Sequence, residues 1–461
     1  MSLNLSDAVA AISDWIWGPP MVALLLGGGL FLTIRIRFFQ LMFFGHALKQ
    51  TVGRIFKKGN GDGTLTPFQA FTSALASTAG ATNVIGVSLA IYLGGPGALF
   101  WMWMVAVIGM ASKYGEILLG IKYREKNEVG EWVGGPMYYI QKGLGWKPLA
   151  LLFAFGLMVE VMPSSMVQSN SISKTVESAF GWPTWLTGLM ITLMTAAVVL
   201  GGVRRIGKVT EKFVPFMVLI YLAMAGAIIL YNIEALPGVF ALIFKHAFTP
   251  ISAAGGFSGA GVAAALRWGM ARGAYSNEAG MGTASIAHAT AQTDHPARQG
   301  LWGIFAVFMD TLVICTVSGL AVLTSGTWTR SENPADIVPA AFGQIYGDSL
   351  GGAMVALFLL IFALSTVGVL IYYGEKQAEY LFGLRFSIIM RYIYIVSIFI
   401  GAIGGLKFIW QFLDILLALI VVPNMIALLF LNKEIKKETE DYIEHVYKKE
   451  KRAASSKKAA G

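Results

Sequence analysis

Long apolar runs, separated by short polar or basic connections, follow one another along almost the whole chain. Each run holds roughly 20 residues, the length that an α-helix needs to cross the hydrocarbon core of a bilayer. The pattern predicts an all-α polytopic membrane protein with about eleven transmembrane helices, near residues 15–34, 67–93, 97–121, 149–180, 184–202, 213–231, 251–275, 300–324, 351–373, 386–404 and 407–431.

Basic residues are concentrated in alternate connections, such as 35–58, 122–126 and 204–212, whereas 94–96 and 181–183 hold none. Cytoplasmic loops collect Lys and Arg. We therefore expect a protein of the cell membrane with its N-terminus outside and its C-terminus on the cytoplasmic side. Setting the first helix aside leaves ten helices. Two groups of five must thread the membrane in opposite senses, which predicts an inverted repeat.

This organisation divides the chain into six segments. We expect an extra N-terminal transmembrane helix (1–35), a cytoplasmic interfacial segment and linker (36–66), a first five-helix repeat (67–231), an extracellular connection (232–250), a second, inverted five-helix repeat (251–431), and a charged cytoplasmic tail (432–461) that is mostly solvated.

The first helix of each repeat carries small and polar residues at mid-membrane depth. Residues 73–86 read SALASTAGATNVIG, and residues 253–261 read AAGGFSGAG. Unsatisfied polar groups in hydrocarbon cost several kcal/mol, so these residues must face protein, water or a ligand. Close helix packing through small residues is the alternative. Because interrupted helices at matching places in two halves mark a transport site, we favour two broken helices that bind a ligand.

A broken helix offers partial positive charge at exposed N–H groups and partial negative charge at exposed carbonyls. We expect the first break near Ala79, Gly80 and Ala81, whose N–H groups could hold a carboxylate. The carbonyls of Ala76, Thr78 and Ala79, with the Asn83 side chain, are hard oxygen ligands that suit an alkali cation. In the second repeat, the carbonyls of 255–261 could hold an ammonium group, with Phe257 as a wall. A small zwitterion matches both poles.

Composition supports the membrane assignment and limits the chemistry. Hydrophobic residues make up 56% of the 461 residues and charged residues only 13%, and the net charge of +9 comes from connections and the tail, so nucleic acid is not a predicted partner. Cys315 is the only cysteine, and the histidine that we considered as a possible metal ligand is His295, beside Asp294 in a connection. We expect no transition-metal site, no cofactor and no enzymatic activity.

Other polar residues within the apolar runs have two readings each. Gln168 and Asn170 either face the ligand or form interhelical hydrogen bonds. The hydroxyls of Ser365 and Thr366 either complete a cation shell or bond back to their own helix. Asp310 is a gate or proton-carrying candidate, or else a structural partner. Arg272 and Glu278 form either a gate or a solvated pair, and we expect Lys113 and Glu116, three residues apart, to pair locally.

Several stretches resemble the alanine or glycine:cation symporters: GGPGALFWMW (94–103), GGPMYYIQKGLG (134–145), QSNSI (168–172), ARGAYSNEAGMGTASIAHATAQT (271–293) and HPARQGLWGIFAVFMDTLVICT (295–316). This family shares the five-plus-five fold of the bacterial leucine transporter. The resemblance implies a sodium site made by Ala76, Ala79, Ser365 and Thr366. It also implies an amino-acid site made by the first break, the second cluster and the fourth run: Gly80, Ala81, Thr82, Asn83, Phe257, Ser258, Gly259, Gly261, Gln168 and Asn170.

These observations predict a symporter that couples inward movement of sodium, or of protons, to uptake of alanine or glycine by alternating access. The lipid bilayer is the expected surrounding, and sodium is the coupling ion rather than a cofactor. A transporter of another small zwitterion is the nearest alternative. A channel would need charge rings or a filter motif, and an enzyme would need a catalytic cluster; neither pattern is visible in the sequence. The sequence leaves the oligomeric state open.

Overall fold

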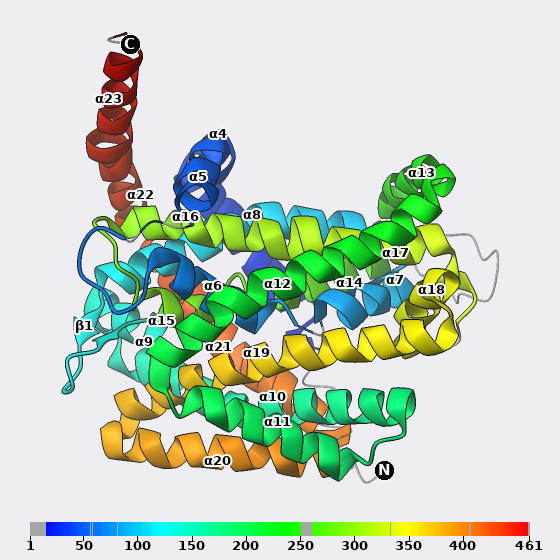
Figure 1. Cartoon of the computed structure of the whole chain (residues 1–461). Helices are drawn as coiled ribbons and strands as arrows, with labels where there is room; N and C mark the ends of the chain where they lie inside the picture. Colours follow the sequence, from blue (N-terminus) through cyan, green and yellow to red (C-terminus); the bar gives the residue numbers. More distant parts are fainter. Residues whose placement is uncertain are drawn as a thin grey trace.

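The computed structural model describes residues 15–55, 57, 59–80, 82–249, 261–331, 333–404 and 407–459. Apart from a two-stranded hairpin, β1 (Glu125–Lys126) and β2 (Trp132–Val133), the regular elements in these ranges are helices. Long helices lie side by side along one direction, with the hairpin at one end and α13 (Leu236–Phe248) and α18 (Ile337–Tyr346) at the other (Figure 1). The predicted all-α architecture is confirmed.

Seven described helices are long and apolar enough to cross a bilayer, and an eighth span is formed by a bent pair. The seven are α8 (Gly97–Lys122), α10 (Lys147–Phe180), α12 (Gly202–Tyr231), the continuous run of α16 (Pro296–Val307), η6 (Phe308–Cys315) and α17 (Thr316–Ser325), α19 (Asp348–Phe382), α20 (Leu384–Ile403), and residues 412–430 of α21 (Lys407–Phe430). Two shorter apolar segments, Pro19–Arg35 and Thr184–Val199 (α11), coincide with two more of the predicted spans.

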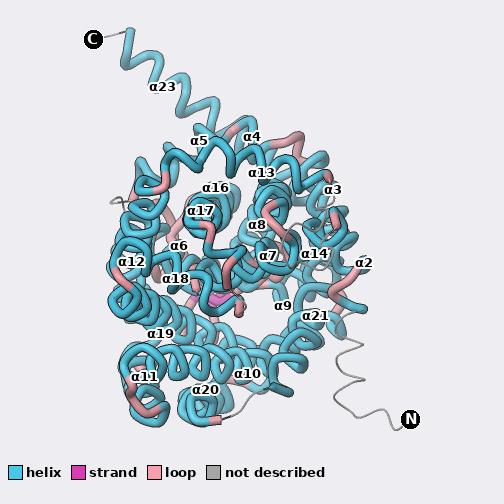
Figure 2. Tube along the Cα trace, turned by 90° about the vertical axis from the view of Figure 1, so that its right-hand side faces the viewer, coloured by secondary structure: helices cyan, strands magenta, loops and turns pink. Residues whose placement is uncertain are grey.

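The bundle has two sides with the interrupted helices between them. Seen along the bundle, α10, α11 and α20 lie on one side and α8, α16 and α17 on the other, while α6 (Pro67–Thr78) and α14 (Val262–Asn277) lie in the middle (Figure 2). Helix α10 packs against α19, α20 and α21, and α8 packs against α14 and α16. The middle position surrounds the interrupted helices with protein, as their polar residues require.

The first interruption lies where the sequence predicts it. Helix α6 begins with a capping box between Thr66 and Gln69 and ends at Thr78. The chain resumes as a π-helical turn, η3 (Thr82–Gly86), and then α7 (Val87–Gly94), and the two halves are bent by 55°. The absence of large side chains next to Gly80 leaves the backbone accessible at this point.

A second interruption lies at a place that the sequence did not predict. It separates α14 from α15 (Thr283–His288), at residues 278–282. Glu278, Gly280 and Gly282 all have positive φ there (+53°, +98° and +79°), so the chain cannot continue as a helix. The predicted break at 255–261 lies outside the described residues except for Gly261, which caps the N-terminus of α14.

The two broken helices run antiparallel, with their breaks at the same level. At one end the Gln292 amide donates to the Leu65 carbonyl (2.8 Å), just before α6. At the other end Gly94 approaches Ala265. Between them the Ser77 hydroxyl donates to the Glu278 carboxylate (3.4 Å). The fold therefore brings both breaks together in the middle of the bundle.

The helices not yet described belong to the N-terminal segment, the stretch after the hairpin and the C-terminal tail. They are α2 (Pro19–Val22), η1 (Ala23–Gly27), α3 (Gly28–Arg35), α4 (Phe39–Met42), α5 (Phe44–Thr51), η2 (Val52–Arg54), α9 (Pro136–Tyr139), η4 (Ile140–Leu144), α22 (Asn432–Asp441), η9 (Tyr442–Tyr447) and α23 (Lys448–Ala459); short 3₁₀ turns lie at Ile233–Ala235 (η5), Thr327–Thr329 (η7) and Pro334–Asp336 (η8).

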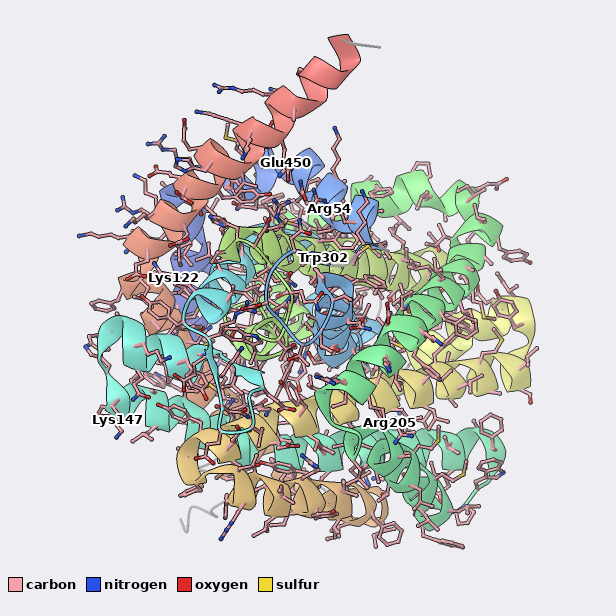
Figure 3. All side chains as sticks on the ribbon, turned by 60° about the vertical axis from the view of Figure 1, so that its left-hand side comes forward. Arg54, Lys122, Lys147, Arg205, Trp302 and Glu450 are labelled. Carbon is pink, nitrogen blue, oxygen red and sulfur yellow. The ribbon has the colours of Figure 1, made fainter. Side chains whose placement is uncertain are left out.

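The expectation of a mostly solvated tail is wrong for its first half. Ile435 and Tyr442 are fully buried, and the Tyr442 hydroxyl bonds to the His46 ring (2.8 Å) on α5. Further along, Glu450 pairs with Arg54 (3.3 Å); Figure 3 labels both residues. Apolar residues at helical spacing within the charged tail account for this docking, because they give it a buried face.

Candidate functional site

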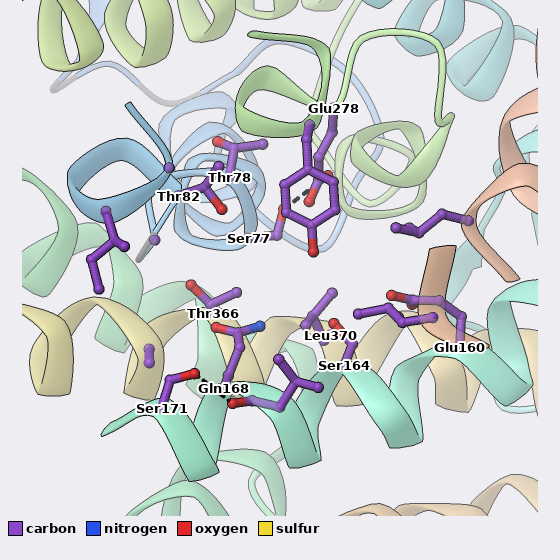
Figure 4. Close-up of a pocket in the computed structure, with 18 of the residues that line it drawn as sticks. Ser77, Thr78, Thr82, Glu160, Ser164, Gln168, Ser171, Glu278, Thr366 and Leu370 are labelled. Carbon is purple, nitrogen blue, oxygen red and sulfur yellow. Dashed lines mark hydrogen bonds between the residues drawn. The ribbon is translucent and has the colours of Figure 1, made fainter. Parts of the chain in front are cut away.

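A cavity of about 570 Å³ lies between the two breaks, α10, α19 and α21. This volume falls within the usual range for small-molecule sites, about 300–1,000 Å³. Figure 4 shows residues of α6 on one side and residues of α10 and α19 on the other. The polar and charged side chains that line the cavity are Ser77, Thr78, Thr82, Glu160, Ser164, Gln168, Ser171, Thr175, Arg272, Tyr275, Glu278, Thr283 and Thr366.

The end of α6 meets α19 through a threonine hydroxyl. Thr366 Oγ1 donates to the Ala76 carbonyl (2.8 Å) and lies 2.9 Å from the Phe362 carbonyl of its own helix. A Cβ added to Gly80 would lie 3.3 Å from the same hydroxyl. A larger residue at this position would therefore crowd Thr366. The site combines a carbonyl at the negative end of a helix with a neutral hydroxyl, which are ligands that suit a hard cation.

The α10 face of the cavity is a polar stripe. Glu160, Ser164, Gln168 and Ser171 are spaced four, four and three residues apart, so they lie on one side of the helix, facing α6 and α19 (Figure 4). Asn170 points elsewhere: its amide donates to the backbone carbonyls of Gly401 (3.1 Å) and Gly404 (2.7 Å). Of the two candidates in this helix, only Gln168 faces the cavity.

The second break contributes charged groups to the same cavity. The Glu278 carboxylate accepts hydrogen bonds from Thr283 Oγ1 (2.6 Å) and Ser77 Oγ (3.4 Å). The Arg272 guanidinium lies over the Trp268 ring, 5.6 Å from its centroid, and within the described part of the chain it forms no ion pair with Glu278. Both residues border the cavity, but the structure does not join them into the pair considered from the sequence.

Asn83 and Asp310 form a buried link behind the first break. Asn83 Nδ2 donates to Asp310 Oδ1 (2.7 Å), and its Oδ1 accepts from the Gly80 amide (2.9 Å). Asp310 Oδ2 accepts from Ser276 of α14 (2.7 Å) and from Thr311 (3.0 Å). This carboxylate already has donors at both oxygens. It connects the two broken helices through side-chain hydrogen bonds.

The other predicted residues occupy varied positions. Ser365 donates to the Phe362 carbonyl (2.7 Å) and lies near Met217 Sδ (3.7 Å), so its hydroxyl does not face Ala76. Ala76 and Ala79 are fully buried. Ala81, Phe257, Ser258 and Gly259 lie outside the described residues, and Gly261 does not line the cavity.

Sequence reasoning did not single out Glu160. This side chain is only 4% exposed and lines the cavity in the first half of α10. An ionisable residue within a membrane-spanning run is by itself a signal of function, and this signal could have identified it. Among the described residues, no group of three or more His, Cys, Asp or Glu side chains could hold a metal ion.

Comparisons with known proteins give matches over most of the chain. The profile of the sodium:alanine symporter family matches residues 2–457. An uncharacterized transporter of Bacillus subtilis (strain 168), YflA, is 51% identical over 92% of this chain and 91% of its own length. The sodium/alanine symporter AgcS of Methanococcus maripaludis is 41% identical over 96% and 98%, respectively. The crystal structure of MhsT in complex with L-phenylalanine has the same fold, with a TM-score of 0.61, 13% identity and coverage of 84% of this chain and 95% of its own.

Proposed function

Because the chain belongs to the sodium:alanine symporter family, we propose that it takes up alanine or glycine by symport with sodium, through alternating access. The observation that carries this proposal is the accessible end of α6, where Gly80 borders the cavity and the Ala76 carbonyl meets Thr366. The symporter AgcS, which this chain covers almost completely, supports the choice of alanine and sodium.

The amino acid would dock between the first break and the stripe of α10. Thr78 and Thr82 line the cavity on either side of Gly80 and offer hydroxyls toward a carboxylate, while the Gly80 amide itself is bonded to Asn83. Gln168 faces this position across the cavity. The ammonium group would lie toward the Glu278 carboxylate. The sequence had suggested the carbonyls of residues 255–261 for this role.

Sodium would bind at the end of α6, where the oxygens of Ala76, Ala79 and Thr366 are hard, neutral ligands. Binding a cation there offsets the partial negative charge of the helix terminus and favours one arrangement of the broken helix. Ser365 and Asn83, which the sequence suggested for this shell, bond to other groups. We assign Asn83 and Asp310 to the link that makes the two broken helices move together.

Energetically, one coupling ion is sufficient. A sodium ion that crosses a potential of 100 mV gains about 2.3 kcal/mol. At about 1.4 kcal/mol for each factor of ten, this sustains an accumulation of roughly fiftyfold before any chemical gradient is added. The basic connections and tail favour a C-terminus in the cytoplasm and an N-terminus outside. An inward sodium gradient across this membrane would then drive uptake into the cell.

Proton coupling is the second candidate, because two carboxylates border the cavity. Glu160 and Glu278 lie within electrostatic range of each other, and either could carry a proton across. The two candidates make different predictions for the same measurement. Proteoliposomes that contain the purified chain should take up labelled alanine when an inward sodium gradient is imposed at equal pH. Uptake that follows only an imposed pH gradient would favour the carboxylates, and uptake that ignores both gradients would refute symport.

A further inference from the structure

The second break contains backbone groups that a helix interior would have paired. Helix α14 ends at Asn277, and the last four carbonyls of a helix lack intrahelical partners and carry partial negative charge. Glu278 follows in a left-handed conformation (φ +53°), which is uncommon for a residue with a Cβ. Something in the surrounding structure must hold this backbone in place.

A buried ammonium group meets the end of α14. Lys113 of α8 is 1% exposed, and its Nζ donates to the Glu278 carbonyl (3.2 Å). A buried charge is tolerated only where it is paired or hydrogen-bonded. The acceptor belongs to the C-cap residue directly after α14 and also accepts from the Met281 amide (3.2 Å), and a cation beside the C-terminal end of a helix interacts favourably with its dipole. The side chain thus occupies the place at which a free cation would be stabilised.

A buried carboxylate meets the amide that follows. Glu116 Oε1, three residues along α8, accepts from the Gly280 amide (2.7 Å). Asn424 of α21 completes the arrangement: its Nδ2 donates both to Glu116 (2.9 Å) and to the Gly280 carbonyl (2.8 Å), and its Oδ1 accepts from the Tyr139 hydroxyl. Lys113 and Glu116 are therefore not simply a local pair on α8. They bind two points of one irregular backbone segment, the carbonyl of Glu278 and the amide of Gly280.

The first break is built differently. The sequence has no charged residue between Phe68 and Leu93, and the side chain that reaches the Ala76 carbonyl is the neutral hydroxyl of Thr366. Within the described residues, no Lys or Arg side chain donates to the carbonyls of the last turn of α6. Two antiparallel helix ends at the same level thus differ in one respect. In this part of the chain, a protein cation is present at the end of α14 and absent at the end of α6.

We propose that Lys113 is a resident cation for the second break. It does for α14 what the coupling sodium does for α6, and one sodium ion accompanies each amino acid. Lys113 is a positioning residue: with Glu116 it holds Glu278 against Ser77 at the wall of the cavity. The inference rests on the proposed function, because it assumes that a sodium ion binds at the first break.

The stoichiometry can be measured on the unmodified protein. Alanine is a zwitterion without net charge, so symport with one sodium moves one charge per alanine. The charge-to-alanine ratio in proteoliposomes, obtained from the potential at which net alanine flux stops under fixed gradients, is expected to be one. A ratio of two would overturn the inference while leaving sodium symport intact. Uptake without sodium dependence would instead refute the proposed function, and the inference with it.

The role of the side chain requires variants. Lys113→Met keeps most of the volume and removes the charge, whereas Lys113→Arg keeps the charge. The matched control is Lys376→Met, because Lys376 is also a buried lysine but pairs with Glu131 (3.1 Å) and Glu379 (2.8 Å), outside the breaks. Alanine binding at saturating sodium should weaken about tenfold or more in Lys113→Met, and Lys113→Arg should recover most of it.

Each readout decides for or against the positioning role. In Lys113→Met, alanine affinity within twofold of the unmodified protein, or an equal loss in Lys376→Met, would overturn it. A steeper sodium dependence in Lys113→Met, with a second sodium needed for binding, would support it strongly, because the ion would then replace the lost ammonium. If Lys113→Met does not fold, Glu116→Gln tests the same segment. It should weaken alanine binding without changing the charge-to-alanine ratio, and unaltered binding would count against the proposal.

Discussion

Removal of the Thr366 hydroxyl should weaken sodium binding more than any other single change at the first break. Thr366→Val keeps the shape of the side chain and removes the hydroxyl that donates to the Ala76 carbonyl. The valine also removes an oxygen that would bind the sodium ion, and the loss of one partner of a buried charged or polar group costs about 1–3 kcal/mol. At about 1.4 kcal/mol per factor of ten, the sodium concentration for half-maximal alanine uptake should rise roughly 5- to 140-fold.

A control variant separates the contact with α6 from the effects of altering a threonine within a helix. Thr324 of α17 is buried and bonds to its own helix through the Leu320 carbonyl (2.7 Å), as Thr366 does through the Phe362 carbonyl (2.9 Å). Thr324→Val removes an equivalent intrahelical bond away from both breaks. The difference between the two variants therefore measures the contribution of the hydroxyl at the first break.

The assay is uptake of labelled alanine into proteoliposomes over a range of sodium concentrations. In Thr366→Val the maximal rate should return at high sodium, because the substrate contacts of α10 are unchanged. Thr366→Ser, which keeps the hydroxyl, should behave like the unmodified protein. A sodium dependence of Thr366→Val within twofold of Thr324→Val would refute the assignment of the cation site.

Three further predictions follow from the contacts. Gln168→Ala should raise the KM for alanine several-fold, because Gln168 lines the cavity. Asn170→Ala should leave the KM unchanged and lower the free energy of unfolding by about 1–3 kcal/mol, because two hydrogen bonds to the end of α20 are lost. Uptake kinetics measure the first effect and thermal unfolding the second. Asp310→Asn should lower the free energy of unfolding by a similar amount and abolish uptake, because an amide cannot accept hydrogen bonds from all the donors that now bind the carboxylate. Uptake at the rate of the unmodified protein would contradict the proposed role of Asn83 and Asp310 in linking the two broken helices. Burial alone would raise the pKa of Glu450, but the nearby Arg298 guanidinium lowers this pKa overall. Docking of the tail, measured by protease accessibility, should therefore be constant above the ordinary glutamate pKa of about 4.3 and weaken as the pH falls through the lower pKa of the folded protein. The variant Glu450→Gln should lose this pH dependence.

The sequence was sufficient to predict the first break, because polar and small residues at the centre of an apolar run are costly in a helix that faces lipid. For the second repeat it pointed to the glycines of 255–261, of which the structure describes only Gly261, and it did not single out the break at residues 278–282. The signal there is weaker: a glutamate and two glycines, each with positive φ. Glu278 has a conformation that a non-glycine residue adopts only when its surroundings impose it, and those surroundings come from α8 and α21, far away in the sequence.

Helical geometry could have sharpened the candidate list. Residues two positions apart lie roughly 200° apart around a helix, so Gln168 and Asn170 could not both face one cavity. Neighbouring residues such as Ser365 and Thr366 are separated by roughly 100°, and only Thr366 reaches the Ala76 carbonyl. Which member of each pair faces the cavity depends on the rotation of α10 and α19 in the bundle. Packing against other helices sets that rotation, and a single sequence does not reveal it.

The difference between the two breaks has a mechanistic reason. A ligand shifts a conformational equilibrium only as far as its affinities for the two states differ. A helix end that is permanently neutralised by Lys113 cannot respond to sodium, so it serves as a fixed wall for the cavity. The end of α6 is paired with the neutral hydroxyl of Thr366, so in the proposed mechanism its electrostatic balance changes when the ion binds and when it leaves. Coupling therefore requires the asymmetry: if both ends carried a lysine, the ion would have no helix terminus left to stabilise, and transport would lose its dependence on the sodium gradient.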